Sequence, residues 1–251
     1  MEAGETSGAI ANTLGDAINS AQSDIHAPLE AIRQVTESSA FEGLAPPIQI
    51  ALFMGALAFL TTLLVSVTSF TRIVIVLSFV RRAMSTQEIP PTVSLIGLAI
   101  FMTAFTMGPT IDAIQNKAIQ PYSAGEISGP VAVNVTSQEL RLFMLRHTRK
   151  SDLALFIQMS QSESIATPAD TPMRILIPAY IISEFKTAFI MGFCIYIPFV
   201  LVDLIVSTIL MSLGMMMMPP VVVSAPIKLM LFVIVDGWHL VARGLGMSFV
   251  T

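Results

Sequence analysis

Charged residues interrupt the long apolar stretches of this 251-residue chain at six positions: Arg72, Glu184, Lys186, Asp203, Lys228 and Asp236. Each would cost at least ~2.5–3.5 kcal/mol at the centre of a bilayer. The chemistry these residues offer is therefore ion pairing, inside the protein or between subunits, which would fix how helices and copies fit together. The competing interpretation is a proton or ion relay, which needs titratable groups along one path. Scattered single charges favour assembly.

Glu184 and Lys186 are two positions apart, so on one helix their side chains point in different directions. We expect each of them to meet a partner elsewhere, either on another helix or on another copy of the chain.

No pattern in the sequence indicates catalysis or a metal centre. Cys194 is the only cysteine, and His26, His147 and His239 share no metal-ligand spacing. No Gly-rich stretch is followed by Lys-Ser or Lys-Thr, as a phosphate-binding loop requires, and no nucleophile stands beside a base. A nucleic-acid binder would carry a basic patch, and none is visible. We expect a protein with no enzymatic activity, cofactor, metal or nucleic-acid partner.

Four consecutive methionines, Met215, Met216, Met217 and Met218, lie between Gly214 and the pair Pro219 and Pro220. Neighbouring residues on a helix point to different faces, so a core helix rarely places one flexible side chain at four adjacent positions. The glycine and the two prolines predict a loop between two helices. Methionine is unbranched and adapts to irregular surfaces. The four side chains are either filler at a bend or an adaptable contact surface.

The elements that must hold these residues are apolar helices. Hydrophobic residues make up 54% of the chain and charged residues 12%, against about 25% charged in ordinary globular domains. About 20 apolar residues span a bilayer. We therefore predict an all-α integral membrane protein with four apolar helices in two long hairpins. Its parts are an acidic polar N-terminal extension (1–47), a first apolar helical hairpin (48–110), a helical insert (111–174) and a second apolar hairpin with the Met-rich loop (175–251).

The insert and the loop charges add two local predictions. "TSQE" at 136–139 is typical of a capping box, with Thr136 as N-cap of a helix that runs to about Gln161. Arg81 and Arg82 lie between the first two apolar runs, so that loop is expected in the cytoplasm. Both termini and the insert 111–174 are then expected on the extracytoplasmic side.

Two long stretches resemble the FliP family: "TSFTRIVIVLSFVRRAMSTQEIPPTVSLIGLAIFMT" and "PAYIISEFKTAFIMGFCIYIPFVLVDLIVSTILMSLGMMMMPPVVVSAPIKLMLFVIVDGWHLV". The likeness runs from about residue 50 to residue 249. It implies a core subunit of the type III protein export gate in the flagellar basal body of the bacterial inner membrane. Several copies, generally five, would assemble with FliQ-like and FliR-like partners into a helical complex around the pore for unfolded proteins. The resemblance also implies that the hairpins lie largely above the membrane plane.

The resemblance assigns a role to the Met-rich loop as well. Met215–Met218 would project into the pore as a gasket, and Gly214, Pro219 and Pro220 would be its hinge. Two alternatives stay open. One is the injectisome homologue of the same family, and the other, from a different class, is a secondary transporter of small solutes or ions with a site around Glu184, Lys186 or Asp203. A purely structural scaffold is a further possibility.

Overall fold

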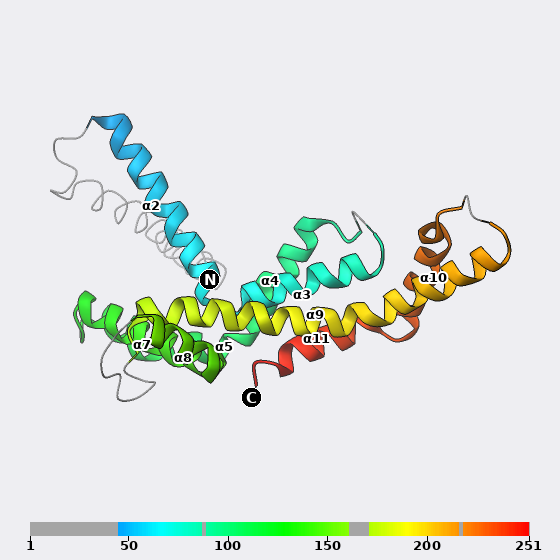
Figure 1. Cartoon of the computed structure of the whole chain (residues 1–251). Helices are drawn as coiled ribbons and strands as arrows, with labels where there is room; N and C mark the ends of the chain where they lie inside the picture. The colour runs from blue at the N-terminus through cyan, green and yellow to red at the C-terminus, as the bar shows by residue number, and fades with distance from the viewer. Residues whose placement is uncertain (1–44, 87–88, 161–170, 216–217, 251) are drawn as a thin grey trace, which may run out of the picture. The chain divides into compact units, whose positions relative to one another are not determined.

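The computed structural model describes residues 45–86, 89–160, 171–215 and 218–250. Met216, Met217 and nearly all of the predicted acidic extension lie outside the described residues. No strand occurs in the described part, and the prediction of an all-helical chain is confirmed there (Figure 1). The elements are α2 (Pro46–Val67), α3 (Phe70–Ala83), α4 (Thr92–Thr106), α5 (Gly108–Ile114), the π-helix η1 (Gln115–Ile119), α6 (Gln120–Ser123), α7 (Gly129–His147), α8 (Lys150–Met159), α9 (Met173–Ser212), α10 (Pro220–Ile234) and α11 (Gly237–Met247).

The chain divides into two units, Met1–Thr61 and Thr62–Thr251. The described part of the first unit is mainly helix α2, whose sequence contains no charged residue and whose side chains are mostly exposed. At a rise of ~1.5 Å per residue, 22 apolar residues are long enough to cross a bilayer. The second unit contains all of the other helices.

The first apolar run does not form the single helix that its composition predicts. Helix α2 ends at Val67 and α3 begins at Phe70, so the region 48–110, where a two-helix hairpin was expected, contains α2, α3, α4 and the start of α5. The polar groups at the break bond to other elements. The Ser69 hydroxyl lies 2.8 Å from the Thr106 hydroxyl, and the Tyr180 hydroxyl donates to the carbonyl oxygen of Thr68 at 3.0 Å. These bonds satisfy polar groups that the helix break would otherwise leave without a hydrogen-bond partner.

The second apolar run extends further than predicted. Helix α4 is followed, after a bend of 61°, by the continuous segment α5–η1–α6, which reaches Ser123. The boundary expected at residue 110 therefore falls inside helical structure.

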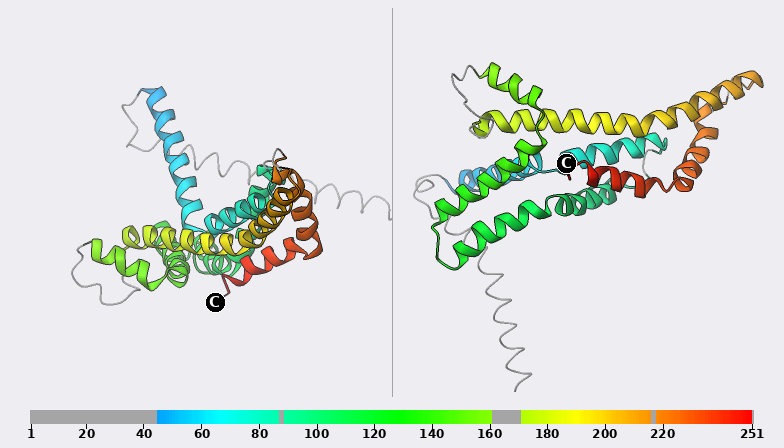
Figure 2. Two further views of the ribbon diagram at one scale, coloured as in Figure 1. Left: turned by 45° about the vertical axis from the view of Figure 1, so that its right-hand side comes forward. Right: turned by 90° about the horizontal axis from the view of Figure 1, so that it is seen from below.

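Helix α9 is the axis of the second unit and has 40 residues, or ~60 Å at the rise of an α-helix. Helix α9 continues through Pro178 and Pro198, although proline inside a helix usually kinks or ends it. Each proline removes one backbone donor, and α9 packs against α3, α7, α8 and α10. Figures 1 and 2 show α7 and α8 beside the start of α9, α3 along its middle, and α10 returning from its far end.

The described part of the insert is mainly helical, but the predicted start of its helix at Thr136 was wrong. Helix α7 begins at Gly129, after Ser128, with Pro130 in its first turn, where the fixed φ of proline suits a helix start. Thr136 therefore lies inside α7, and its hydroxyl donates to the carbonyl oxygen of Ala132 at 2.9 Å, so it caps nothing. Helix α7 ends at His147, and Thr148 and Arg149 separate it from α8.

Two groups of buried apolar side chains form the core of the second unit. The first group joins α3 to α4, α9, α10 and α11, and includes Ile73 and Val76. The second joins α7 and α8 to the start of α9, and includes Met144 and Leu176. Phe249, just after α11, packs against both groups and so lies where they meet.

Helices α2 and α9 are long and apolar enough to cross a membrane, and the bent pairs α4 with α5–η1–α6 and α10 with α11 raise the possible number of spans to four. These apolar helices fit a membrane protein. Only 17% of the most apolar window of α9 is buried in the chain itself. The remainder needs lipid or other protein to cover it.

Candidate functional site

Arg72 and Glu184 form a buried ion pair between α3 and α9. Their side chains are 3% and 0% exposed. Arg72 Nε donates to Glu184 Oε2 at 2.8 Å, and Nη2 donates to Oε1, which makes the pair bidentate. The remaining terminal nitrogen, Nη1, donates to both the carbonyl oxygen and the hydroxyl of Ser248, each at 3.0 Å. All three guanidinium nitrogens are thus used.

Lys228 and Asp203 form a second pair, between α10 and α9. Lys228 is 2% exposed, and its ammonium group donates to Asp203 Oδ2 and, at 2.7 Å, to the Ser85 hydroxyl. The Ser224 hydroxyl donates to the other oxygen of Asp203 at 2.6 Å. Ser85 stands just after α3 with a positive φ of 57°. This group therefore joins both arms of the α9–α10 hairpin to the end of α3.

Lys186 belongs to a third, more exposed group between α8 and α9. Its ammonium nitrogen lies 3.7 Å from Asp152 Oδ1, and its side chain is 50% exposed. Asp152 also accepts a hydrogen bond from the Ser183 hydroxyl at 2.8 Å, and that hydroxyl accepts one from the backbone N–H of Arg149 at 3.0 Å. Glu184 and Lys186 thus have different partners on different helices.

Asp236, like Lys186, has an exposed side chain. It stands at the corner between α10 and α11 with a left-handed backbone, φ 51° and ψ 53°. Aspartate tolerates this conformation better than most side chains do. The observed role of Asp236 within the single chain is therefore conformational, and its burial would require another molecule.

The buried Arg72–Glu184 pair and the part-buried Lys228–Asp203 pair stand at opposite ends of α3. From Arg72 to Ser85 the chain rises ~20 Å as a helix. The side chains that pack between them, among them Ile73, Val76 and Val80, are apolar. A relay needs a continuous path of titratable groups. The described residues between the pairs provide no such path, and the arrangement favours fixing helix positions.

The Met-rich loop joins α9 to α10. Helix α9 ends in a Schellman motif: Met215 N–H donates to the carbonyl of Leu210, and Gly214 N–H donates to that of Met211, both at 3.1 Å. Gly214 has φ +75°, which a residue with a Cβ rarely adopts. Pro219 and Pro220 begin α10, where their missing donors leave no helix bond unmade. Met215 and Met218, at the two sides of the loop, are each 41% exposed.

Several residues that complete these groups carried no signal in the sequence. Ser85 and Ser248 are common polar residues in unremarkable positions, and Asp152 stands in a mixed stretch of acids and bases. Phe249 lies with its ring centroid 3.9 Å from the guanidinium carbon of Arg72. Only the spatial neighbourhood identifies these residues, because each contacts a partner more than 30 positions away in the chain.

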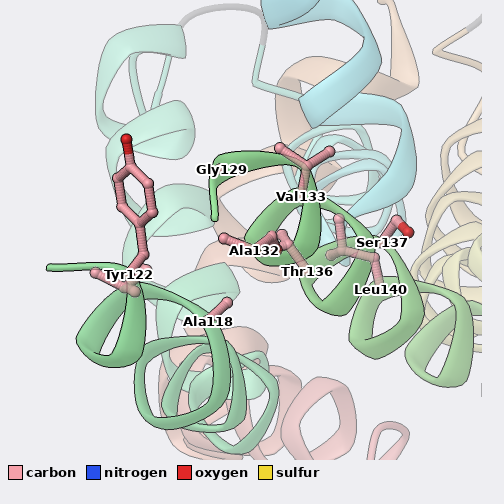
Figure 3. A pocket seen from close by; sticks show the side chains of 9 residues that line it. Ala118, Tyr122, Gly129, Ala132, Val133, Thr136, Ser137 and Leu140 are labelled. Atoms are coloured by element: carbon pink, nitrogen blue, oxygen red, sulfur yellow. Dashed lines mark hydrogen bonds between the residues drawn. The ribbon is translucent and has the colours of Figure 1, made fainter. Parts of the chain in front are cut away.

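A groove of about 570 Å³ separates η1 and α6 from α7 (Figure 3). Ala118 and Tyr122 line one wall, and Ala132, Val133 and Leu140 line the other. No charged residue lines it, and none of the predicted site residues reaches it. The groove therefore offers apolar contact surface and no acid, base or metal ligand.

Comparison with known proteins shows the family of this chain. The model of the FliP family matches residues 53–245. The flagellar biosynthetic protein FliP of Pectobacterium carotovorum is 46% identical over 202 residues, which cover 80% of this chain and 78% of that protein. The FliP of Bacillus subtilis is 43% identical over 86% of this chain and 97% of that protein, and the FliP of Aquifex aeolicus is 42% identical over 82% and 87%. The chain therefore belongs to the FliP family.

Proposed function

We propose that this chain is a core subunit of the flagellar type III protein export gate in the bacterial inner membrane. Several copies, five by the family resemblance, would assemble with FliQ-like and FliR-like partners around the pore for unfolded flagellar proteins. The three relatives named above are flagellar proteins, which favours this branch over the injectisome homologue. The chain would help to form the pore through which unfolded proteins pass and would hold the assembly together, without catalysis.

The observation that carries the proposal is the Met-rich loop at the tip of the α9–α10 hairpin. Flexible Met side chains stand at the end of two arms that are rigidly joined by the Lys228 and Asp203 pair. A rigid base with an adaptable tip is what a seal around a changing polypeptide requires. Repeated from several copies, Met215–Met218 would meet in a ring that excludes water and ions between substrates.

The topology proposed for the assembled gate follows the loop charges. Arg81 and Arg82 would face the cytoplasm, while both ends of the described chain and the insert with α7 and α8 would face the extracytoplasmic side. The uncovered apolar faces of α9 and α10 would pack on neighbouring subunits, so that hydropathy overstates the lipid-facing surface. The pairs Arg72–Glu184 and Lys228–Asp203 would keep each subunit in one shape during assembly.

Replacing Met215–Met218 by alanine tests the gasket. We expect the variant to assemble normally but to conduct ions, because alanine side chains are too short to meet across the pore. Membrane potential and growth in cells that make the variant gate would report the leak. Met159→Ala, which shortens a methionine outside the loop that is 67% exposed, is the matched control. An assembled, ion-tight alanine variant would leave the loop without its proposed role.

A further inference from the structure

The short segment after α11 closes the Arg72 site from one side. Glu184 occupies Nε and Nη2 of the guanidinium group, and Ser248 accepts both hydrogen bonds that Nη1 donates. The Phe249 ring covers the face of the guanidinium at 3.9 Å. A buried cation requires partners on every side, because each unmet donor loses its hydration without compensation. Ser248 and Phe249 therefore complete a site to which α3 and α9 contribute only half.

Phe249 also connects parts of the core that otherwise have separate contacts. Its ring meets the His147 ring edge-on, with centroids 5.2 Å apart, and His147 in turn meets Phe143 at 4.7 Å. The same ring packs against both buried apolar groups. Docking of this one side chain thus fixes the end of α11 relative to α3, α7 and α9 together.

A closely packed corner between α10 and α11 fixes the two helices relative to each other. Gly237 at the start of α11 lies under the Phe232 ring so closely that a Cβ there would stand 2.2 Å from a ring carbon. Trp238 meets the same ring edge-on at 5.3 Å, and Phe232 packs against Phe199 of α9 at 6.3 Å. Because the corner is filled by rings, α11 and α10 move together.

We propose that Ser248 and Phe249 are positioning residues for the Met-rich loop. By holding the end of α11 on Arg72, they hold α10, the return arm of the loop, in the place where Met215–Met218 of neighbouring copies can meet. The inference rests on the proposed export-gate function and assigns a part in it to residues some 30 positions beyond the loop. Lys228 holds α10 along its length, and the Ser248–Phe249 segment holds, through α11, the end of α10 that is farther from the loop.

The experiment measures loop geometry in the assembled gate. Met215→Cys in a Cys194→Ala background provides a single thiol, and oxidative cross-linking between copies in native membranes reports whether neighbouring loops meet. Phe249→Ala is then added. Loss of the ring over a desolvated cation should lower the cross-link yield, per assembled complex, about three- to thirtyfold, and ions should leak. Phe249→Tyr keeps the ring and should restore the yield, whereas a purely structural role would change only the amount of complex.

Val250→Ala is the matched control, since the Val250 side chain is 85% exposed. If Phe249→Ala prevents assembly, Ser248→Ala and Phe249→Leu decide the question, because both keep most of the packing. Unchanged cross-linking and an ion-tight gate in an assembled Phe249 or Ser248 variant would overturn the inference. Failure of the proposed function is seen separately: loops of the otherwise unsubstituted protein would not cross-link, and the Met215–Met218 alanine variant would not leak.

Discussion

At the scale of single residues, five of the six charges that looked expensive in an apolar chain are paired with other parts of the same chain, and the sixth, Asp236, is exposed. Arg72 and Glu184 come from helices 112 positions apart and leave no guanidinium nitrogen unpaired. A buried pair of this kind adds little net stability compared with apolar side chains, but removal of one member leaves the other charge uncompensated. Its value is therefore that α3 and α9 can pack in only one register.

Glu184→Gln tests this account. The amide still accepts one hydrogen bond but carries no charge, so we expect a loss of about 3 kcal/mol, at the lower end for a broken buried pair. The matched control is Glu139→Gln, whose partner Lys117 is 61% exposed and which should change stability by less than ~1 kcal/mol. Denaturant unfolding of the purified protein in nanodiscs measures both. Equal effects of the two substitutions would contradict a special role for the buried pair.

His147 lies at the end of α7, outside the membrane-spanning candidates, and is a second residue with a measurable signature. Burial, followed by the charges of Arg72 and Arg146, lowers the pKa of its imidazole from 6.5 to about 4. The unfolded chain therefore takes up this proton at a higher pH than the folded chain does. The stability that the neutral ring contributes is complete above pH 6.5 and is lost as the pH falls from 6.5 towards 4.

His147→Gln should flatten the pH dependence of unfolding in that window, because the variant has no proton to take up there. Thermal unfolding at a series of pH values would measure the slope, with His239→Gln as the control, since His239 is exposed. A slope that persists unchanged in the His147 variant would assign the acid sensitivity to other groups.

At the scale of elements, close contact between α3 and α9 organises the second unit. Gly192 of α9 lies against the Phe79 ring, and a Cβ at this glycine would stand 2.5 Å from two ring atoms. The same ring meets Phe189 edge-on at 5.5 Å. One of these atoms is the ring carbon nearest the backbone, so the side chain cannot simply swing away. The glycine sets how closely the two helices approach.

Gly192→Ala is therefore expected to destabilise the protein by about 1–3 kcal/mol, the usual effect of overpacking a core. Gly244→Ala in α11 is the control, because no heavy atom lies within 4 Å of its added Cβ. That substitution should leave stability unchanged or raise it by ~0.5–1 kcal/mol through helix propensity. The comparison uses the same unfolding assay. A harmless Gly192→Ala would mean that the interface between α3 and α9 is looser than the contact indicates.

At the scale of the whole molecule, the single chain leaves too much apolar surface uncovered to exist alone in water. Large apolar side chains remain exposed along the second half of α9 and along α10, among them Phe193, Leu204, Val222 and Val233. Lipid could cover them, as could neighbouring subunits. The prolines and paired charges in these helices are better suited to a protein environment, since lipid supplies no polar partner.

Native mass spectrometry of the tagged chain, gently purified from its own membrane, distinguishes these environments. We expect several copies together with two kinds of small membrane protein, because the exposed faces of α9 and α10 need partners. The identity of those partners would separate the flagellar gate from the injectisome. A stable monomer or dimer without them would favour the transporter and direct attention to Glu184, Lys186 and Asp203.

The sequence by itself determined the helical class, the apolar character and the family. A chain with 12% charged residues has too little polar surface to face water. Gly214, Pro219 and Pro220 act locally on the backbone, so neighbouring residues suffice to predict the loop. It also identified the charged residues that need partners. It did not identify the break at Ser69, the start of α7 at Gly129 or the continuity of α9 through its prolines, because neighbouring helices decide these against local preference.

Only the tertiary structure decided which charge meets which. The partners of Arg72 stand 112 and 176 positions away, and Lys228 reaches Ser85 across 143 positions. Pairings at such separations depend on how whole helices pack. The same sequence composition is compatible with several ways of pairing the six charged residues. Phe249 illustrates the physical reason. No sequence pattern distinguishes Phe249 from other aromatic residues. Its role arises entirely from the buried Arg72 cation that folding places beneath its ring.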